Sequence, residues 1–273
     1  MIPLQHELLC NLRLEPMIVR AVELLRENVP PEGYYGCFSG GKDSCVIKEL
    51  ARLAGVPVVW HYNVTTVDPP ELVQFIVDHH PDVKRLHPGT RMFDEAAKRG
   101  LPTRTKRWCC EKFKESRSPK GATMLMGMRA AESPRRAAMW SEVVYHERTK
   151  CNAVLPVFAW SDAHVWECIK AQALPYCCLY DEGFSRLGCV GCPMATARLR
   201  LHQFARWPSI ESQWKDACAR LWHAKQDRIG CEYLSRFPSP ESLWNWWVMD
   251  EFCPPKQCGE MKLFEPEDEH GGA

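Results

Sequence analysis

The chain has 273 residues, with 35 Lys and Arg against 34 Asp and Glu, and a formal net charge of +1. This balance gives no global field of the kind that marks a nucleic-acid or membrane-surface protein. A hydrophobic content of 45% is ordinary for a globular chain, and no apolar run approaches the roughly 18 residues that cross a bilayer. Residues 1–11 lack the basic-then-apolar layout of a secretory signal, so we expect a cytoplasmic protein with no membrane partner.

Helical and strand patterns alternate from the N-terminus onward. Residues 17–29 are amphipathic and end at Pro30-Pro31, residues 34–38 are an apolar run typical of a buried strand, and residues 44–54 return to helical spacing. Pro69-Pro70 open a helix that continues to His79. The remaining predictions are strands at 56–62, 83–86, 123–128 and 153–158, and helices at 92–99 and 162–173, the last one capped by Asp162.

The stretch Ser39-Gly40-Gly41-Lys42-Asp43-Ser44, which we call the glycine loop, joins the first strand to the following helix. Its glycines let the backbone approach a ligand, and the first helical N–H groups then face an anion. Lys42 adds a cation, and the two serines add hydroxyl donors. The run 36–43 also matches the start of a P-loop, but Asp43 stands where that motif needs Ser or Thr. The stretch instead resembles the PP-loop of ATP pyrophosphatases, which cleave ATP to AMP and pyrophosphate.

The alternation of strands and helices predicts an α/β fold, a doubly wound and mostly parallel sheet with a C-terminal helical appendage. Ligands of such sheets bind beyond the carboxyl ends of the strands, so the glycine loop, Asn63–Asp68 and Gly127–Arg129 should converge. We expect an N-terminal helix over 1–30, a nucleotide-binding domain over 31–192, a Trp-rich helical subdomain over 193–264 and a disordered tail over 265–273.

Fifteen cysteines are the anomaly of the composition. In a reducing compartment their pairs indicate metal or redox chemistry rather than a disulfide framework. Cys109-Cys110 and the Cys189-x-x-Cys192 pair could supply four thiolates to tetrahedral zinc or to a four-iron cluster. Adjacent cysteines fit a compact zinc tetrahedron poorly, which favours iron–sulfur. Cys177-Cys178 are alternative ligands, and buried structural thiols are the alternative to any metal.

Several segments resemble the phosphoadenosine phosphosulfate (PAPS) reductase family of the PP-loop superfamily. They are Leu174-Pro175-Tyr176, the run Leu179 to Cys189, Pro156–Asp162 with Val165-Trp166, and Gly127-Met128-Arg129 with Glu132-Ser133 and Arg136. With the glycine loop and Cys109-Cys110, the resemblance covers roughly residues 34 to 193. It implies that Cys109, Cys110, Cys189 and Cys192 carry a [4Fe–4S] cluster, with zinc the less favoured metal.

Our functional expectation is adenylation of a substrate, with pyrophosphate release, in iron–sulfur-assisted sulfur transfer. ATP and Mg²⁺ would bind Ser39 to Ser44, Lys42 and Asp43 would act on the phosphates and metal, and Arg129 with Arg136 would steady the developing charge. Gly127 belongs to the same phosphate site, and Asn63 is a candidate for the adenosine. The chain is also similar to the PP-loop enzyme of DNA phosphorothioation and to tRNA thiolation enzymes, and a cysteine desulfurase is a candidate partner.

Reduction of a sulfonucleotide to sulfite is the alternative enzyme function. The reductases carry a C-terminal Glu-Cys-Gly-x-His, whereas this chain has Gln257-Cys258-Gly259-Glu260. Cys258 would then attack the sulfur, and thioredoxin would clear the product. The intact Lys42-Asp43 pair favours ATP, because these reductases often have an eroded loop.

Two further alternatives concern binding. The chain could be a non-catalytic nucleotide-binding module with a structural metal. A basic stretch between Arg104 and Lys120, with Trp207 or Trp214 as stacking platforms, could bind a nucleic-acid substrate. Trp207, Trp214 and Trp222 recur at helical core spacing, however, so we expect them to pack a helix.

Overall fold

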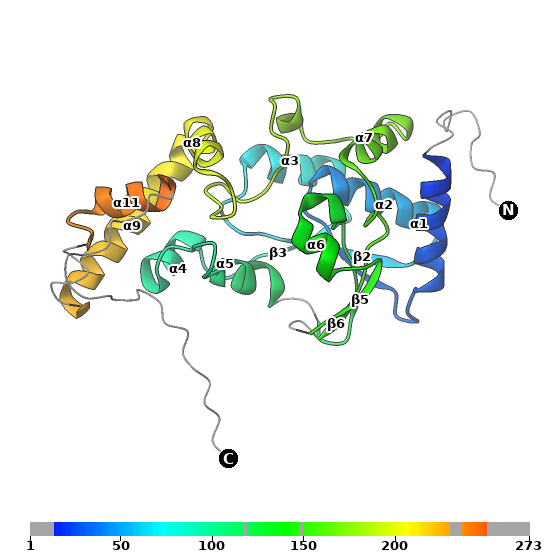
Figure 1. The fold of residues 1–273 in the computed structure, drawn as a ribbon, viewed down its shortest axis with the longest axis horizontal. Helices are drawn as coiled ribbons and strands as arrows, with labels where there is room; N and C mark the ends of the chain where they lie inside the picture. Colours follow the sequence, from blue (N-terminus) through cyan, green and yellow to red (C-terminus); the bar gives the residue numbers. More distant parts are fainter. Residues whose placement is uncertain (1–13, 117–118, 148–149, 230–235, 250–273) are drawn as a thin grey trace, which may run out of the picture. The chain divides into compact units, whose positions relative to one another are not determined.

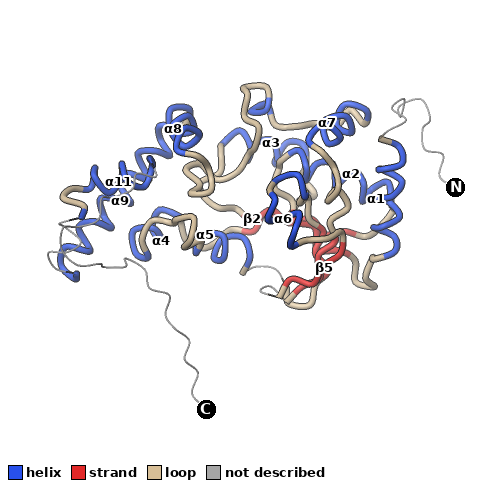
Figure 2. The backbone as a smooth tube through the Cα atoms, in the orientation of Figure 1, coloured by secondary structure: helices blue, strands red, loops and turns tan. Residues whose placement is uncertain are grey.

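The computed structural model describes residues 14–116, 119–147, 150–229 and 236–249. The chain divides into two compact units, one of residues 1–95 and 102–194 and one of residues 96–101 and 195–273. The described strands all belong to the first unit, and the second unit is helical in its described parts (Figures 1 and 2).

A six-stranded sheet in the order β3-β2-β1-β4-β6-β5 forms the centre of the first unit. Only β5 among these strands runs antiparallel, and it pairs with β6 at one edge. The strands are β1 (Tyr34–Cys37), β2 (Val58–Asn63), β3 (Lys84–Leu86), β4 (Thr123–Leu125), β5 (Val143–His146) and β6 (Cys151–Val154). The predicted α/β class with a mostly parallel sheet is confirmed.

Helices flank this sheet. Those of the first unit are α1 (Glu15–Glu27), α2 (Lys42–Ala54), α3 (Pro70–His79), α5 (Trp108–Cys110), α6 (Pro134–Met139) and α7 (Asp162–Ala171). The residues of α4 (Met92–Arg99) are divided between the two units. A short π-helix covers Glu111–Glu115, and single 3-10 turns cover Ala130–Glu132 and Cys178–Tyr180. Helix α2 packs against both α1 and α7 (Figure 1). It buries Val46, Ile47 and Leu50 completely, so the helix that begins at the glycine loop is anchored by the core.

Gly36 shows why the P-loop match is accidental. It lies inside β1, and a Cβ at this position would come within 2.3 Å of the Trp60 ring on the neighbouring strand. The glycine therefore makes room for a core tryptophan and has no part in a phosphate loop.

The second unit is built from α8 (Ala197–Arg206), α9 (Pro208–Ile229) and α11 (Pro240–Met249). Trp214, Trp244 and Trp247 share a core with Phe204, and the Trp214 and Trp247 rings lie 4.8 Å apart. Trp207 and Trp222 are buried too, which confirms the expectation that these tryptophans pack the helices.

One local prediction was wrong, and one strand was missed. Ser161, not Asp162, caps α7: its hydroxyl accepts the His164 N–H at 3.2 Å, and Asp162 is the first helical residue. Strand β5 was missed, because a four-residue edge strand carries too few alternating positions to stand out. The predicted tail at 265–273 lies outside the described residues. No helix in the described parts is both long and apolar enough to cross a membrane.

Candidate functional site

The glycine loop lies at the switch point of the sheet. Strands β1 and β4 are neighbours, although the chain places β2 and β3 between them, and the loops after both leave from the carboxyl ends. Crevices of this kind are where doubly wound sheets bind ligands. The two loops touch: a Cβ on Gly127, after β4, would lie 3.1 Å from the Asp43 carbonyl carbon. The predicted convergence of these two segments is confirmed.

The glycine loop turns sharply into α2. Gly40 has a φ of +72°, and a Cβ there would come within 2.7 Å of Leu72 on α3. Gly41 is the N-cap of α2, and the Ser44 hydroxyl donates to the Gly41 carbonyl at 2.7 Å. The Ser39 hydroxyl in turn donates to that of Ser44 at 3.3 Å. The serine hydroxyls therefore brace the loop, while the first N–H groups of α2 have no intrahelical partner.

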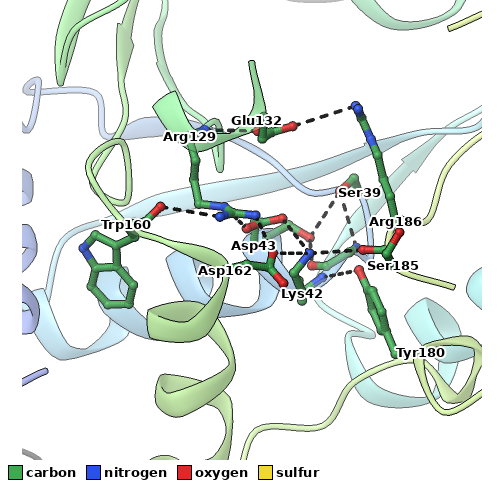
Figure 3. Close-up of polar contacts among 12 residues, drawn as sticks. Ser39, Lys42, Asp43, Arg129, Glu132, Trp160, Asp162, Tyr180, Ser185 and Arg186 are labelled. Carbon is green, nitrogen blue, oxygen red and sulfur yellow. Dashed lines mark hydrogen bonds and ion pairs between the residues drawn. The ribbon is translucent and has the colours of Figure 1, made fainter. Parts of the chain in front are cut away.

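Two buried cations meet two carboxylates above this turn (Figure 3). Lys42 and Arg129 are each only 4% exposed. Arg129 donates from Nε to Asp43 at 2.5 Å and from Nη2 to Asp162 Oδ1 at 2.9 Å. Lys42 Nζ lies 3.1 Å from the same Asp162 oxygen. The Asp162 side chain is 61% exposed, so this carboxylate closes the group on its solvent side.

The pKa values of the two carboxylates are shifted in opposite directions. Burial raises the pKa of Asp43 above its ordinary value, and the charges of Lys42 and Arg129 offset only part of this effect. Partial burial also works to raise the pKa of Asp162, but hydrogen bonding and charge from Lys42, with the charge of Arg129, lower it overall. Asp162 is therefore ionised at neutral pH and holds both cations in place.

The other predicted phosphate and adenosine residues lie around this group. Glu132 accepts the Arg129 backbone N–H at 3.1 Å and pairs with Arg136 one turn later, so Arg136 is linked to the site through Glu132. Asn63 ends β2, where its amide donates to the Lys114 carbonyl at 3.0 Å. Because Lys114 is close to the cysteines described below, Asn63 lies on their side of the site.

The four predicted cysteine ligands are brought together from two segments. Cys109 and Cys110 lie on α5, and Cys189 and Cys192 lie on one turn, closed by a Cys192 N–H to Cys189 carbonyl bond of 3.3 Å. The Cys110 thiol, burial, and then Cys189 and Cys192 all raise the pKa of Cys109. Hydrogen bonds from Cys109 and Arg107 lower that of Cys110 despite burial. The thiols of Cys110, Cys189 and Cys192 are thus close enough to act electrostatically on that of Cys109.

Four cysteine thiols are a donor set that either zinc or a four-iron cluster takes. Tetrahedral zinc with Zn–S bonds of about 2.3 Å needs closely grouped thiolates. Among the described side chains, no group of three or more His, Cys, Asp or Glu is placed to hold one metal ion. Four cysteine thiols are also the donor set that a [4Fe–4S] cluster takes. Lys114 lies beside them, since Cys189 raises its pKa against the opposing effect of burial.

Cys177 is not linked to this set. Burial raises the pKa of Cys177 to about 11, and the thiol that affects it is Cys178. Cys258 lies outside the described residues.

In the basic stretch between Arg104 and Lys120, two cations have partners within the protein. Lys112 pairs with Glu95 at 2.9 Å, and Arg107 donates to Cys110 at 3.3 Å.

The fold and the loop define a nucleotide-binding α/β protein of the PP-loop class. Residues 34–195 match the phosphoadenosine phosphosulfate reductase domain, and the chain belongs to that family. The range contains the glycine loop, Arg129 and all four cysteines of the set.

The chain is also similar in sequence to individual proteins. The chain is 30% identical to the uncharacterized protein MJ0066 of Methanocaldococcus jannaschii over 77% of its own length and 45% of that protein. It is 25% identical to an adenosine 5′-phosphosulfate reductase of Staphylococcus haemolyticus, with coverages of 65% and 76%. It is 29% identical to a probable FAD synthase of Caenorhabditis elegans, with coverages of 61% and 31%. The chain spans about half the length of the first two curated relatives that it matches.

A solved structure supports the fold. Candida glabrata FMN adenylyltransferase, in complex with FAD and inorganic pyrophosphate, superposes with a TM-score of 0.50 at 16% identity, covering 65% of this chain and 64% of that one.

Three residues of the site were not predicted from the sequence to belong to it: Asp162, Tyr180 and Ser185. Each lies in a segment that carried the family resemblance, and that membership was the available signal. Tyr180 accepts the Lys42 backbone N–H at 2.9 Å, and Ser185 accepts from Lys42 Nζ at 3.4 Å. These contacts join residues about 140 positions apart, which no local pattern encodes.

Proposed function

We propose that this chain is a PP-loop enzyme that binds ATP and adenylates a substrate with release of pyrophosphate, in iron–sulfur-assisted sulfur transfer. One observation carries the proposal: two buried cations, Lys42 and Arg129, meet at the N-terminus of a core-anchored helix at the switch point of the sheet. Backbone N–H groups, the helix dipole and cations at one point suit a polyphosphate. The similarity to a probable FAD synthase supports nucleotide transfer, and the intact Lys42-Asp43 pair supports ATP.

The residues of the glycine loop and Arg129 would have separate roles in this reaction. The amides of Gly41 and Lys42 would bind the pyrophosphate end, and Lys42 Nζ would neutralise its charge. A nucleophile on the acceptor would attack the α-phosphorus, the bond to the bridging oxygen would break, and pyrophosphate would leave while the nucleophile loses its proton to solvent. Arg129, oriented by Asp43, would stabilise the added negative charge. Asp43 would help to hold a magnesium ion bound with ATP, directly or through water, and that ion would supply charge screening to the phosphates.

The cysteine set is the proposed site of the cluster. Cys109, Cys110, Cys189 and Cys192 would ligate it, and the cluster would supply a sulfur-binding or electron-transfer centre. Gly188 and Gly191 leave the backbone around the Cys-x-x-Cys turn free to approach the sulfurs. Anaerobically purified protein should contain four irons and four sulfides per chain, and Cys192→Ser should lose both.

The test of the nucleotide site is ATP binding and pyrophosphate release by anaerobically prepared protein. The wild-type chain should bind ATP with magnesium, and Lys42→Ala should lose at least about tenfold in affinity because a buried charge-assisted contact is removed. Lys48→Ala is the matched control, since Lys48 lies on the same helix but pairs with Asp82 away from the loop. Equal ATP affinity in wild type and Lys42→Ala would contradict the proposal.

Reduction of a sulfonucleotide remains the second candidate because of the similarity to an adenosine 5′-phosphosulfate reductase. It would use Cys258 as the nucleophile. Sulfite formation from adenosine phosphosulfate that disappears in Cys258→Ser would favour this function over adenylation.

A further inference from the structure

Residues 180–185 contact the start of α2 at the position where a phosphate would bind. The Tyr180 hydroxyl accepts the Lys42 N–H at 2.9 Å, and a Cβ on Gly41 would lie 3.4 Å from the same oxygen. Lys42 Nζ lies 5.6 Å from the centre of the Tyr180 ring and 3.4 Å from the Ser185 carbonyl oxygen. Figure 3 shows the tyrosine reaching the loop from outside the group of charges.

The Lys42 N–H is one of the first amides of α2. Lys42 is the first residue of the helix, so this N–H has no acceptor within the helix. The tyrosine hydroxyl supplies that acceptor. A hydroxyl oxygen is neutral and makes a weaker bond to an amide than a phosphate oxygen does.

Tyr180 is held in this position by other rings. Its ring meets Trp166 edge to face at 5.1 Å, and Tyr176 lies 6.4 Å away. Burial raises the pKa of Tyr180 well above its ordinary value, so the hydroxyl stays protonated and uncharged. Tyr176 packs on the same tryptophan, but its hydroxyl bonds to Asp181 at 3.1 Å instead of the loop.

We infer that the Tyr180 hydroxyl substitutes for a phosphate oxygen on the Lys42 amide, so that it orients this donor and must be displaced by the phosphate of a bound nucleotide. The inference rests on the proposed function. A phosphate must bind the Lys42 amide more strongly than the Tyr180 hydroxyl does in order to displace it. A strongly charged phosphate chain displaces the hydroxyl, whereas a weakly basic anion such as sulfate competes poorly. Tyr180 is thus a positioning residue that lowers the affinity of the Lys42 amide for any anion.

The test compares Tyr180→Phe with the matched control Tyr176→Phe in the full anaerobically prepared chain. Removing the Tyr180 hydroxyl should tighten inorganic pyrophosphate binding by about two- to tenfold, the range of one net neutral hydrogen bond. Sulfate binding should improve by a similar factor, because sulfate on the Lys42 amide must displace the same hydroxyl. Tyr176→Phe should leave both affinities unchanged.

Hydrogen exchange gives a readout that is independent of ligand. The Lys42 amide should exchange faster in Tyr180→Phe than in wild type or Tyr176→Phe, measured at a temperature where all three chains are fully folded. Unchanged or weaker pyrophosphate binding by Tyr180→Phe, or unchanged exchange at Lys42, would overturn the inference.

The outcomes also separate the two proposals. If Lys42→Ala loses pyrophosphate while Tyr180→Phe behaves as wild type, the proposed function stands and the inference fails. If neither wild type nor Tyr180→Phe binds pyrophosphate, both fail.

Discussion

At the scale of single residues, Gly40 is the position that the loop can least replace. Alanine there must adopt a left-handed φ of +72° and must also fit a Cβ within 2.7 Å of buried Leu72. Gly89 has a similar φ of +69° with nothing within 4 Å of the added atom. We expect Gly89→Ala to cost about 1 kcal/mol of unfolding free energy and Gly40→Ala about 2–4 kcal/mol, because overpacking adds to strain. Urea unfolding measures both, and equal losses would contradict the packing argument.

His80 gives the protein a pH dependence of its own. It is buried beside Phe38, with Nδ1 3.2 Å from Lys48 Nζ and Nε2 3.9 Å from Cys45 Sγ. Burial and then the charge of Lys48 lower the pKa of His80 to about 4, while Asp82 works to raise it and His79 to lower it further. As the pH falls, His80 therefore binds a proton in the unfolded chain before it does so in the folded chain. The contribution of neutral His80 to the free energy of unfolding is fully present above pH 6.5 and is lost as the pH falls from 6.5 toward 4.

The expected loss at His80 is on the order of 2 kcal/mol. His80→Asn should flatten this part of the profile of unfolding free energy against pH. His79→Asn, at the exposed neighbouring position, should keep the wild-type slope. A slope in His80→Asn as steep as in wild type would show that other groups cause the acid sensitivity.

At the scale of elements, the second unit depends on its aromatic core. Trp247 is 3% exposed and lies between the rings of Trp214 and Trp244, whereas Trp246 on the same helix is half-buried and meets Phe237. Trp247→Ala should cost about 3–5 kcal/mol and Trp246→Ala clearly less. Unfolding followed by circular dichroism measures both. If Trp247→Ala kept its stability, the core assignment would be wrong.

Some elements and contacts of the site could be predicted from the sequence, and others could not. The loop, α2 and the Gly127–Arg129 segment were predictable because each is a contiguous pattern, and parallel topology then brings them together. The Asp43–Arg129 contact follows from that convergence. Asp162 was assigned only as a cap, because its role depends on cations that lie 120 and 33 positions away in the chain. Strand β5 is defined by pairing with β6 more than by its own residues.

For the whole molecule, the division into two compact units predicts two unfolding events. Pyrophosphate at about 100 times its Kd should stabilise the unit that binds it by about 2.7 kcal/mol. Hydrogen exchange in increasing urea should therefore show later loss of protection in β1 and α2, with α9 and α11 unchanged. A shift of the same size in all four elements would mean that the chain unfolds as one cooperative body.

The central claim, that the glycine loop binds the phosphates of ATP, is tested most directly by a crystal structure of the protein with magnesium and a non-hydrolysable ATP analogue. The account predicts β- and γ-phosphate oxygens on the amides of Gly41 and Lys42, with the Tyr180 hydroxyl moved off the Lys42 N–H. A nucleotide bound elsewhere, with the Lys42 N–H still donating to Tyr180, would contradict it.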